Sequence, residues 1–433
     1  MPARQTARKA LMLCRTRGAW SDAVLREQIE QAGLSRKDAA LCTTLCCGVL
    51  QNQALLDYYI DEFLTGRKHL QPALRDILRL AVYQITMLDR IPDAAAVNEA
   101  VKQAKAQFSQ REAGLCNALL RNMLRNKDKL TPPKDYAICY SHPADLVDLM
   151  KASVGKRLGA ILEADNSPVE TCVQVNPLKT DAETLKAQLE QQGAEVTPHP
   201  WEQGCFLIRG AGDIAKMPAF QQGLMQVQDP AARLSVDVMG LKPGMRVLDL
   251  CAAPGGKSMA AAMHMGNQGE ILSCDVHEGK LPQIQMAAER LGISIVLAAE
   301  NDASVFRPEW EEAFDAVIAD VPCSGLGVIR KKPDIRYKNL SELEQLPPLQ
   351  RAILQQAGRY VRPGGILLYS TCTILRRENE EVALDFLREN RNFAAQSLPL
   401  PEGLTEDQTG MLTLYQGIHH CDGFFMCKMR KQL

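Results

Sequence analysis

From Pro243 onward, strand-length apolar runs alternate with helical stretches, and this alternation restricts the possible fold more than any other feature. Such a rhythm is typical of a parallel sheet covered by helices on both faces. We therefore expect an α/β domain over residues 241–433. Its expected strands are residues 245–250, 271–274, 295–297, 316–319 and 366–369, with a terminal antiparallel hairpin at 411–415 and 423–429.

Residues 1–130 lack this alternation and are predicted to form a bundle of helices. Apolar residues between positions 74 and 88 recur at intervals of three, four and seven, which places one apolar stripe on a helix. Arg75, Asp76 and Arg79 lie outside this apolar stripe and are expected on the exposed side of the helix. Further helices are expected after Pro92 and over residues 113–124.

A linker at Thr131, Pro132 and Pro133 separates the helical region from a segment of mixed periods. Residues 131–240 are predicted to form a small α+β domain. Thr180, followed three residues later by Glu183, has the spacing of a capping box, so a helix is expected to begin there. The other expected elements are a helix over residues 143–162 and strands over 171–175, 205–209 and 224–228.

Charge is distributed unevenly, although the formal net charge of the whole chain is -1. Residues 1–130 carry 20 Lys and Arg against 13 Asp and Glu, whereas the remainder carries 30 against 38. A basic module joined to an acidic one suggests a polyanionic partner for the first, and a chance asymmetry on a solvated surface is the alternative.

Cysteine and histidine usage bears on redox environment and metal binding. The 14 cysteines include no C-x-x-C pair and the seven histidines form no metal motif, so we expect no disulfide framework, no metal and a reducing cytoplasm. No apolar run approaches the roughly 18 residues of a membrane span, so no contact with a membrane is expected.

A glycine-rich turn follows the first strand of the predicted α/β domain. The strand ends at Asp249, and the chain then passes into Pro254, Gly255 and Gly256, where missing side chains let backbone N–H groups approach a ligand. The turn lacks the G-x-G-x-x-G spacing of dinucleotide binders and the first glycine of a phosphate loop. A nucleoside cofactor without a pyrophosphate fits better, and S-adenosylmethionine is the common one.

Two carboxylates follow the next two predicted strands. Asp275 lies 19 residues past Gly256, near where an acidic residue usually reaches ribose hydroxyls, and Asp302 is placed to meet an adenine edge. An isolated Gly-Gly turn would be more typical of a plain strand-to-helix connection. With these two acids, the pattern favours a cofactor site.

Two cysteines, Cys323 and Cys372, each follow a predicted strand of the same sheet, so both are expected to face the cofactor crevice. Either one alone would be more typical of core packing, because cysteine is among the most buried residues. Together with Asp320 they supply what methylation of cytosine at C5 requires. A thiolate adds to C6, a carboxyl stabilises charge at N3, and a further group assists loss of the C5 proton.

A thiol has an ordinary pKa of about 8.5, so the nucleophile needs a positive field to ionise. Lys257 is one candidate for this field, and the run Arg330, Lys331 and Lys332 is another. The alternative for the run is a solvated stretch of charges.

Three motifs of the α/β domain resemble those of the RNA cytosine-C5 methyltransferase family. In that family the cysteine after a Ser-Thr step is the nucleophile and the Pro-Cys cysteine assists release, which the resemblance carries over to Cys372 and Cys323. Val321 departs from the alanine of many members and touches no proposed contact. The motifs are Leu248-Asp249-Leu250-Cys251-Ala252-Ala253-Pro254-Gly255-Gly256-Lys257, Asp320-Val321-Pro322-Cys323-Ser324-Gly325 and Ser370-Thr371-Cys372-Thr373, and residues 327–337 look like that family's extension of the second cysteine loop.

The same resemblance implies an S-adenosylmethionine-dependent, Rossmann-like domain. The cofactor positions that it carries over are Cys251, Ala252, Ala253, Pro254, Gly255, Gly256, Lys257, Asp275, Asp302 and Asp320.

Residues 78–84, 92–101 and 117–121 resemble the NusB-type RNA-binding bundle, and this pairing of domains is similar to the Sun or Fmu type of bacterial 16S rRNA cytosine-C5 methyltransferases. The resemblance implies a cytoplasmic enzyme whose substrate is cytosine 967 in conventional rRNA numbering. It also implies that the bundle and the α+β domain recognise the RNA, and we expect a monomer. The candidate phosphate contacts are Arg111, Arg121, Arg125, Lys127 and Lys129.

Three alternatives stay open on the sequence alone. DNA cytosine methylation uses the Pro-Cys thiol as nucleophile, and the extra thiol at Cys372 argues against it. A tRNA substrate would need the same catalytic groups. A non-catalytic RNA-binding factor would not need Asp320, Cys323 and Cys372 together.

Overall fold

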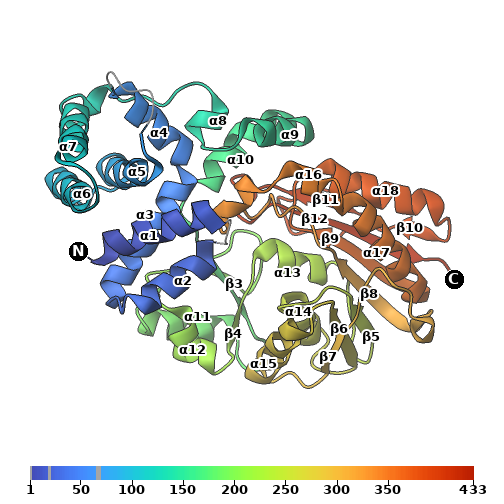
Figure 1. The fold of residues 1–433 in the computed structure, drawn as a ribbon. Helices are drawn as coiled ribbons and strands as arrows, with labels where there is room; N and C mark the ends of the chain where they lie inside the picture. The colour runs from blue at the N-terminus through green and yellow to red at the C-terminus, as the bar shows by residue number, and fades with distance from the viewer. Residues whose placement is uncertain (1, 18–20, 65–69) are drawn as a thin grey trace. The chain divides into compact units, whose positions relative to one another are not determined.

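The computed structural model describes residues 2–17, 21–64 and 70–433 (Figure 1). The chain divides into two compact units. The first unit contains Met1–Ser167 and the later segment Ile329–Lys338, and the second contains Pro168–Val328 and Asn339–Leu433. The predicted fold class is confirmed: a helical bundle, a small α+β domain and an α/β domain with a sheet covered on both faces.

The first unit is built from helices, and α5 runs through its core. The buried face of α5 includes Leu74, Ile77 and Leu78, in line with the predicted stripe. Ser109 and Glu112 form a capping box that begins α7. The elements are α1 Pro2–Arg17, α2 Ser21–Gln31, α3 Arg36–Gln51, α4 Gln53–Glu62, α5 Pro72–Met87, α6 Asp93–Gln107, α7 Gln110–Arg125, η1 Lys127–Lys129, α8 Tyr136–Cys139, α9 Ala144–Val154, η2 Gly155–Arg157, α10 Leu158–Asp165 and η6 Pro333–Tyr337.

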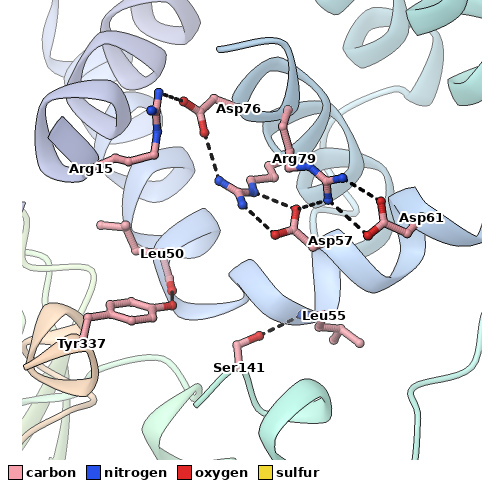
Figure 2. Close-up of polar contacts among 10 residues, drawn as sticks. Arg15, Leu50, Leu55, Asp57, Asp61, Asp76, Arg79, Ser141 and Tyr337 are labelled. Atoms are coloured by element: carbon pink, nitrogen blue, oxygen red, sulfur yellow. Dashed lines mark hydrogen bonds and ion pairs between the residues drawn. The ribbon is translucent and has the colours of Figure 1, made fainter. Parts of the chain in front are cut away.

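Asp76 and Arg79 of α5 are buried, so the prediction that they lie outside was wrong. Figure 2 shows why burial is possible: Arg79 donates to both carboxylate oxygens of Asp57, at 2.9 and 2.6 Å, and to Asp76 at 3.0 Å. Arg15 donates to the other oxygen of Asp76 at 3.1 Å. Buried charges persist only when they are paired, and residues distant in sequence supply the partners here.

The segment Ile329–Lys338 is anchored in this helical unit by two side chains. Arg336 is fully buried and its Nη1 donates to the carbonyls of Gln51, at 2.8 Å, and Ser141, at 3.2 Å. The Tyr337 hydroxyl donates to the carbonyl of Leu50 at 2.9 Å (Figure 2). Shortly after Cys323, the chain therefore enters the unit formed by its own first 167 residues.

Two helix boundaries in residues 131–240 differ from expectation. The helix predicted over 143–162 is interrupted at Gly155, which adopts a positive φ of 57°. The cap expected at Thr180 is instead Asp181, whose carboxylate accepts from the Thr184 N–H at 2.8 Å. An ionised Asp is a strong cap, and the turn formed at residues 176–180 leaves Asp181 as the first residue free to serve.

The second unit begins with a four-stranded antiparallel sheet in the order β2-β3-β1-β4. Strand β2 was not predicted, because its residues are mostly exposed and give no apolar run. The elements are β1 Thr171–Val175, α11 Ala182–Gln191, β2 Glu195–Pro198, β3 Cys205–Arg209, η3 Ile214–Lys216, α12 Pro218–Gln221, β4 Met225–Val227 and α13 Pro230–Asp237.

The same unit contains an eight-stranded sheet ordered β10-β12-β9-β8-β5-β6-β7, with β11 paired to β12. Strands β5 to β9 pair in parallel, and the predicted terminal hairpin is confirmed as β11 and β12, which also extends the sheet beyond β9. The elements are β5 Arg246–Asp249, α14 Gly256–His264, β6 Glu270–Asp275, η4 Glu278–Lys280, α15 Leu281–Leu291, β7 Val296–Glu300, η5 Pro308–Trp310, β8 Phe314–Asp320, α16 Leu340–Leu343, α17 Leu346–Tyr360, β9 Val361–Thr371, η7 Arg376–Glu378, α18 Glu380–Glu389, β10 Phe393–Ala395, β11 Met411–Leu414 and β12 Phe424–Lys431.

Side chains alternate between the two faces of this sheet, as strand geometry requires. Val247 and Ile318 pack with α14 and α15, whereas Leu248 and Val317 pack with α17 and α18 on the opposite face. Figure 1 labels these four helices. The chain leaves β5 toward β6 on one side and later returns to β8 on the other. Strand order therefore reverses at β5, and ligands of open α/β sheets bind outside the strand ends at such a point.

Among the described residues, no single helix has the length and apolar character to cross a membrane, although α3 and α4, bent by 78°, meet that test as a pair.

Candidate active site

The turn after β5 lies at this switch point and is closed by backbone contacts. Gly255 has a φ of 102°, a left-handed conformation that favours glycine, and it precedes the first residue of α14, Gly256. No side chain caps this helix, so its first N–H groups are open to a ligand. Gln226 of β4 donates to the Gly256 carbonyl at 2.9 Å and holds the turn in place.

A series of buried hydrogen bonds connects the two ends of the turn to the neighbouring strand β6. The Ser258 hydroxyl donates to Asp249 at 2.7 Å, and the Ser273 hydroxyl donates to that of Ser258 at 2.7 Å. Burial raises the pKa of the Asp249 carboxyl to about 7. Asp249 was predicted only to end the strand, and neither Ser258 nor Ser273 was predicted to belong to the site.

Asp275 and Asp302 occupy the positions expected of them, at the ends of neighbouring strands. Asp275 is buried, accepts from the His277 N–H at 3.0 Å, and has the Lys280 ammonium 3.5 Å away. Asp302 is exposed, and hydrogen bonds from the hydroxyl and N–H of Ser304 hold its pKa below the ordinary value.

Asp320 ends β8 and is oriented by two donors. Lys257 Nζ donates to one carboxylate oxygen at 2.7 Å, and Ser370 Oγ donates to the other at 2.8 Å. Lys257 also lies over the ring of Phe424, 4.9 Å from its centroid. The carboxylate is thus fixed by α14 and β9, next to the strand end that carries Cys372.

Cys323 and Cys372 are in direct contact, with their sulfur atoms 3.3 Å apart. The contact with Cys323 lowers the pKa of the Cys372 thiol. Burial and the Asp320 carboxylate oppose this lowering, and Lys257 supports it. That same contact, together with burial, raises the pKa of Cys323 well above its ordinary value. The pair is therefore polarised, with Cys372 as the sulfur that ionises first.

The loops that carry the two thiols are joined by buried polar groups. The Glu378 carboxylate accepts from the Ser324 N–H and from Gln350, each at 2.9 Å. The hydroxyls of Ser324 and Thr373 lie 2.7 Å apart. Glu378, six residues past Cys372, was not predicted, because nothing in its sequence surroundings distinguishes it from an exposed glutamate.

A close backbone approach at Gly327 completes this arrangement. Its N–H donates to the Cys372 carbonyl at 3.0 Å, and its carbonyl accepts from the Gly423 N–H at 2.8 Å. A Cβ at Gly327 would lie 1.9 Å from the Gly423 oxygen.

The substitution Gly327→Ala is accordingly expected to destabilise the protein by about 3 kcal/mol, because the added Cβ would collide with backbone atoms of Gly423, which no side-chain rotation can move away. Urea unfolding measures the effect. Gly279→Ala is the matched control, since nothing lies within 4 Å of a Cβ there. Equal stability of the two variants would contradict the tight backbone contact at Gly327.

The structure brings the predicted site residues to one end of the sheet. Lys257 contacts Asp320, and Cys323 contacts Cys372, whereas Asp275 and Asp302 contact residues of their own loops. The run at 330–332 belongs to the helical unit, so Lys257 is the predicted cation that the second unit itself places beside Cys372.

The turn fits S-adenosylmethionine. Two adjacent glycines leave room at the uncapped start of α14, and three acids, Asp275, Asp302 and Asp320, lie at or just after the ends of β6, β7 and β8. Buried polar atoms on Asp249 and Gln228 have no partner within the protein. These features and the strand order define an S-adenosylmethionine-dependent methyltransferase.

Family models match most of the chain: residues 236–430 match 16S rRNA methyltransferase RsmB/F, 1–125 match the NusB family, and 142–215 match the RsmF/B-like ferredoxin-like domain. The probable ribosomal RNA small subunit methyltransferase B of Bacillus subtilis is 35% identical, covering 99% of this chain and 98% of that protein. The Vibrio cholerae ribosomal RNA small subunit methyltransferase B is 32% identical, covering 93% and 92%.

Comparison with solved structures gives related folds. The crystal structure of PH0851 superimposes with a TM-score of 0.80 at 27% identity, over 100% of this chain and 99% of that one. NSun6 from Pyrococcus horikoshii, determined with SFG, shares the fold with a TM-score of 0.59 at 21% identity, over 67% and 98%. The chain belongs to the RsmB/F family of small-subunit rRNA methyltransferases.

Proposed function

We propose that this protein methylates C5 of a cytosine in 16S rRNA through a covalent bond between Cys372 and C6 of the base. The observation that carries the proposal is the contact between Cys323 and Cys372, which lowers the pKa of Cys372 beside the fixed carboxylate of Asp320. A site for methylation of a ring nitrogen or a ribose hydroxyl would have no use for a polarised pair of thiols.

The proposed steps assign one role to each group. The Cys372 thiolate adds to C6, and the Asp320 carboxyl, held by Lys257 and Ser370, donates a proton to N3 and so neutralises the negative charge that moves there. S-adenosylmethionine, when bound, supplies the methyl group that C5 takes up. A base then removes the C5 proton, the C5–C6 double bond re-forms, and the bond to sulfur breaks. The proton on N3 returns to Asp320 when the C5–C6 double bond re-forms. Cys323, within 3.3 Å of the departing sulfur, assists this release.

The cofactor is proposed to lie on the turn from Cys251 to Lys257, with Asp275 toward the ribose and Asp302 toward the adenine. Ala252, Ala253, Pro254, Gly255 and Gly256 would contribute backbone contacts. Asp320 would face both cofactor and base. We further propose a monomer that acts in the cytoplasm, with domains at 1–130, 131–240 and 241–433.

The RNA substrate is proposed to bind through the NusB-like bundle, whose basic residues Arg111, Arg121, Arg125, Lys127 and Lys129 would contact phosphates. The target is proposed to be cytosine 967. Bisulfite sequencing of ribosomal and transfer RNA, from cells with and without the gene, tests this. Loss of one protected cytosine at that position in 16S rRNA is expected. Loss at a tRNA position instead would make tRNA the substrate, and unchanged protection in both RNAs would contradict C5 methylation.

A further inference from the structure

Gln228 is a buried glutamine whose side chain has no hydrogen-bond partner in the protein. It is 8% exposed, and neither Nε2 nor Oε1 has a partner. Among the residues that the structure describes, it is the only glutamine or asparagine whose side-chain nitrogen and oxygen are both buried without a hydrogen-bond partner. An unpaired buried amide costs stability, so its presence calls for a ligand that the protein alone does not supply.

The position of Gln228 connects this amide to the cofactor turn. The residue follows β4, and its Nε2 would lie 3.6 Å from a Cβ placed on Gly256, the first residue of α14 (both elements are labelled in Figure 1). The Gln228 N–H donates to the Cys172 carbonyl at 3.2 Å, so its backbone is held to β1. Gln226, two residues earlier, already donates to the Gly256 carbonyl. Gln226 therefore positions the turn, and Gln228 beside it is left to bind something else.

The groups beside Gln228 and the start of α14 determine which kind of ligand could bind there. The uncapped start of α14 presents N–H donors and the positive end of the helix dipole, which attract an anion. The Gln228 amide adds further donors at one atom and an acceptor at the other. A group that carries a carboxylate and an ammonium on one carbon would satisfy both. The methionine end of S-adenosylmethionine is such a group.

We propose that Gln228 binds the α-amino and α-carboxylate groups of the cofactor's methionine moiety. This inference rests on the proposed cofactor site and adds to it a residue outside the α/β domain motifs. It also explains why a buried amide is retained at a cost in stability.

Calorimetric titration with S-adenosylhomocysteine and competition by 5′-methylthioadenosine, which lacks the amino-acid end, test the assignment. Gln228→Leu is expected to weaken S-adenosylhomocysteine binding by about 10- to 100-fold, the range for hydrogen bonds to charged groups, while 5′-methylthioadenosine competes as well as before. The variant is also expected to unfold at a temperature no lower than the wild type, because leucine removes an unpaired amide.

Gln103→Leu in α6 is the matched control, since that buried glutamine also has an unpaired Oε1 but lies in the helical unit. It should bind both ligands as the wild type does. Unchanged S-adenosylhomocysteine affinity in a folded Gln228→Leu protein would overturn the inference and leave the proposed function intact. An equal loss for both ligands would also overturn it, because the residue would then support the turn as a whole. Failure of the wild type to bind S-adenosylhomocysteine would overturn the proposed function and this inference with it.

Discussion

Replacing Cys372 with alanine is expected to abolish methylation and to leave no RNA attached to the protein on a denaturing gel. The reason is that Cys372 carries the thiol whose pKa the site lowers, so its loss removes the atom that bonds to C6. Cys323→Ala should instead allow attack and methyl transfer while slowing release, so that a protein–RNA adduct accumulates.

Cys323→Ala should also change how adduct formation depends on pH. Removing Cys323 removes the hydrogen bond that lowers the pKa of Cys372, so the adduct should form more slowly near neutral pH and faster as the pH rises. Cys274→Ala is the matched control, because burial raises the pKa of that thiol to about 12 and it lies within β6. It should methylate normally. An adduct with Cys372→Ala and none with Cys323→Ala would reverse the roles and match the arrangement of DNA cytosine methyltransferases.

The second large effect is expected at Asp320. Asp320→Asn should reduce kcat by about 10²- to 10⁴-fold, the usual contribution of a positioned proton-transferring group, with little change in KM for RNA. The amide keeps the shape of the side chain but cannot share a proton with N3 as the carboxyl does. Single-turnover methylation of 16S rRNA measures the effect.

Asp315→Asn is the control for that measurement, since Asp315 lies on the same strand, β8, near its opposite end. Its partners are Arg362 and the Arg246 N–H, remote from the thiols along the strand. A decrease in kcat of less than about tenfold for Asp320→Asn, or an equal decrease for Asp315→Asn, would remove Asp320 from the catalytic role.

The sheet and the main site residues could be predicted because their signals are local. Buried parallel strands appear as short apolar runs, and the residues that follow them, such as Asp320 and Cys372, must meet at one edge. The contacts of Glu378 and Ser370 could not be predicted in this way. Each depends on a partner supplied by another element, and a single polar residue gives the same signal in the sequence whether it is buried or solvated.

In the helical region, too, local sequence does not determine which polar residues become buried. A periodic stripe identifies the apolar face of α5, but Asp76 and Arg79 become buried only because Arg15 and Asp57 come from α1 and α4. The cap shift from Thr180 to Asp181 is of another kind: both residues can cap, and the preceding turn decides between them. Local propensity thus identifies the helix, whereas its first residue and its buried ion pairs depend on the rest of the fold.

The docking of Arg336 and Tyr337 has a consequence for how such a protein can be divided or recombined. The helical unit is completed by a segment encoded far downstream of Ser167, inside the catalytic half of the gene. A truncated chain that ends before Ile329 lacks the Arg336 guanidinium, which donates hydrogen bonds to the carbonyls of Gln51 and Ser141. A catalytic fragment without the helices, in turn, leaves Arg336 without those acceptors. Exchange of the helical module between relatives would therefore require that residues 329–338 are exchanged together with residues 1–167, although the two segments are far apart in the sequence.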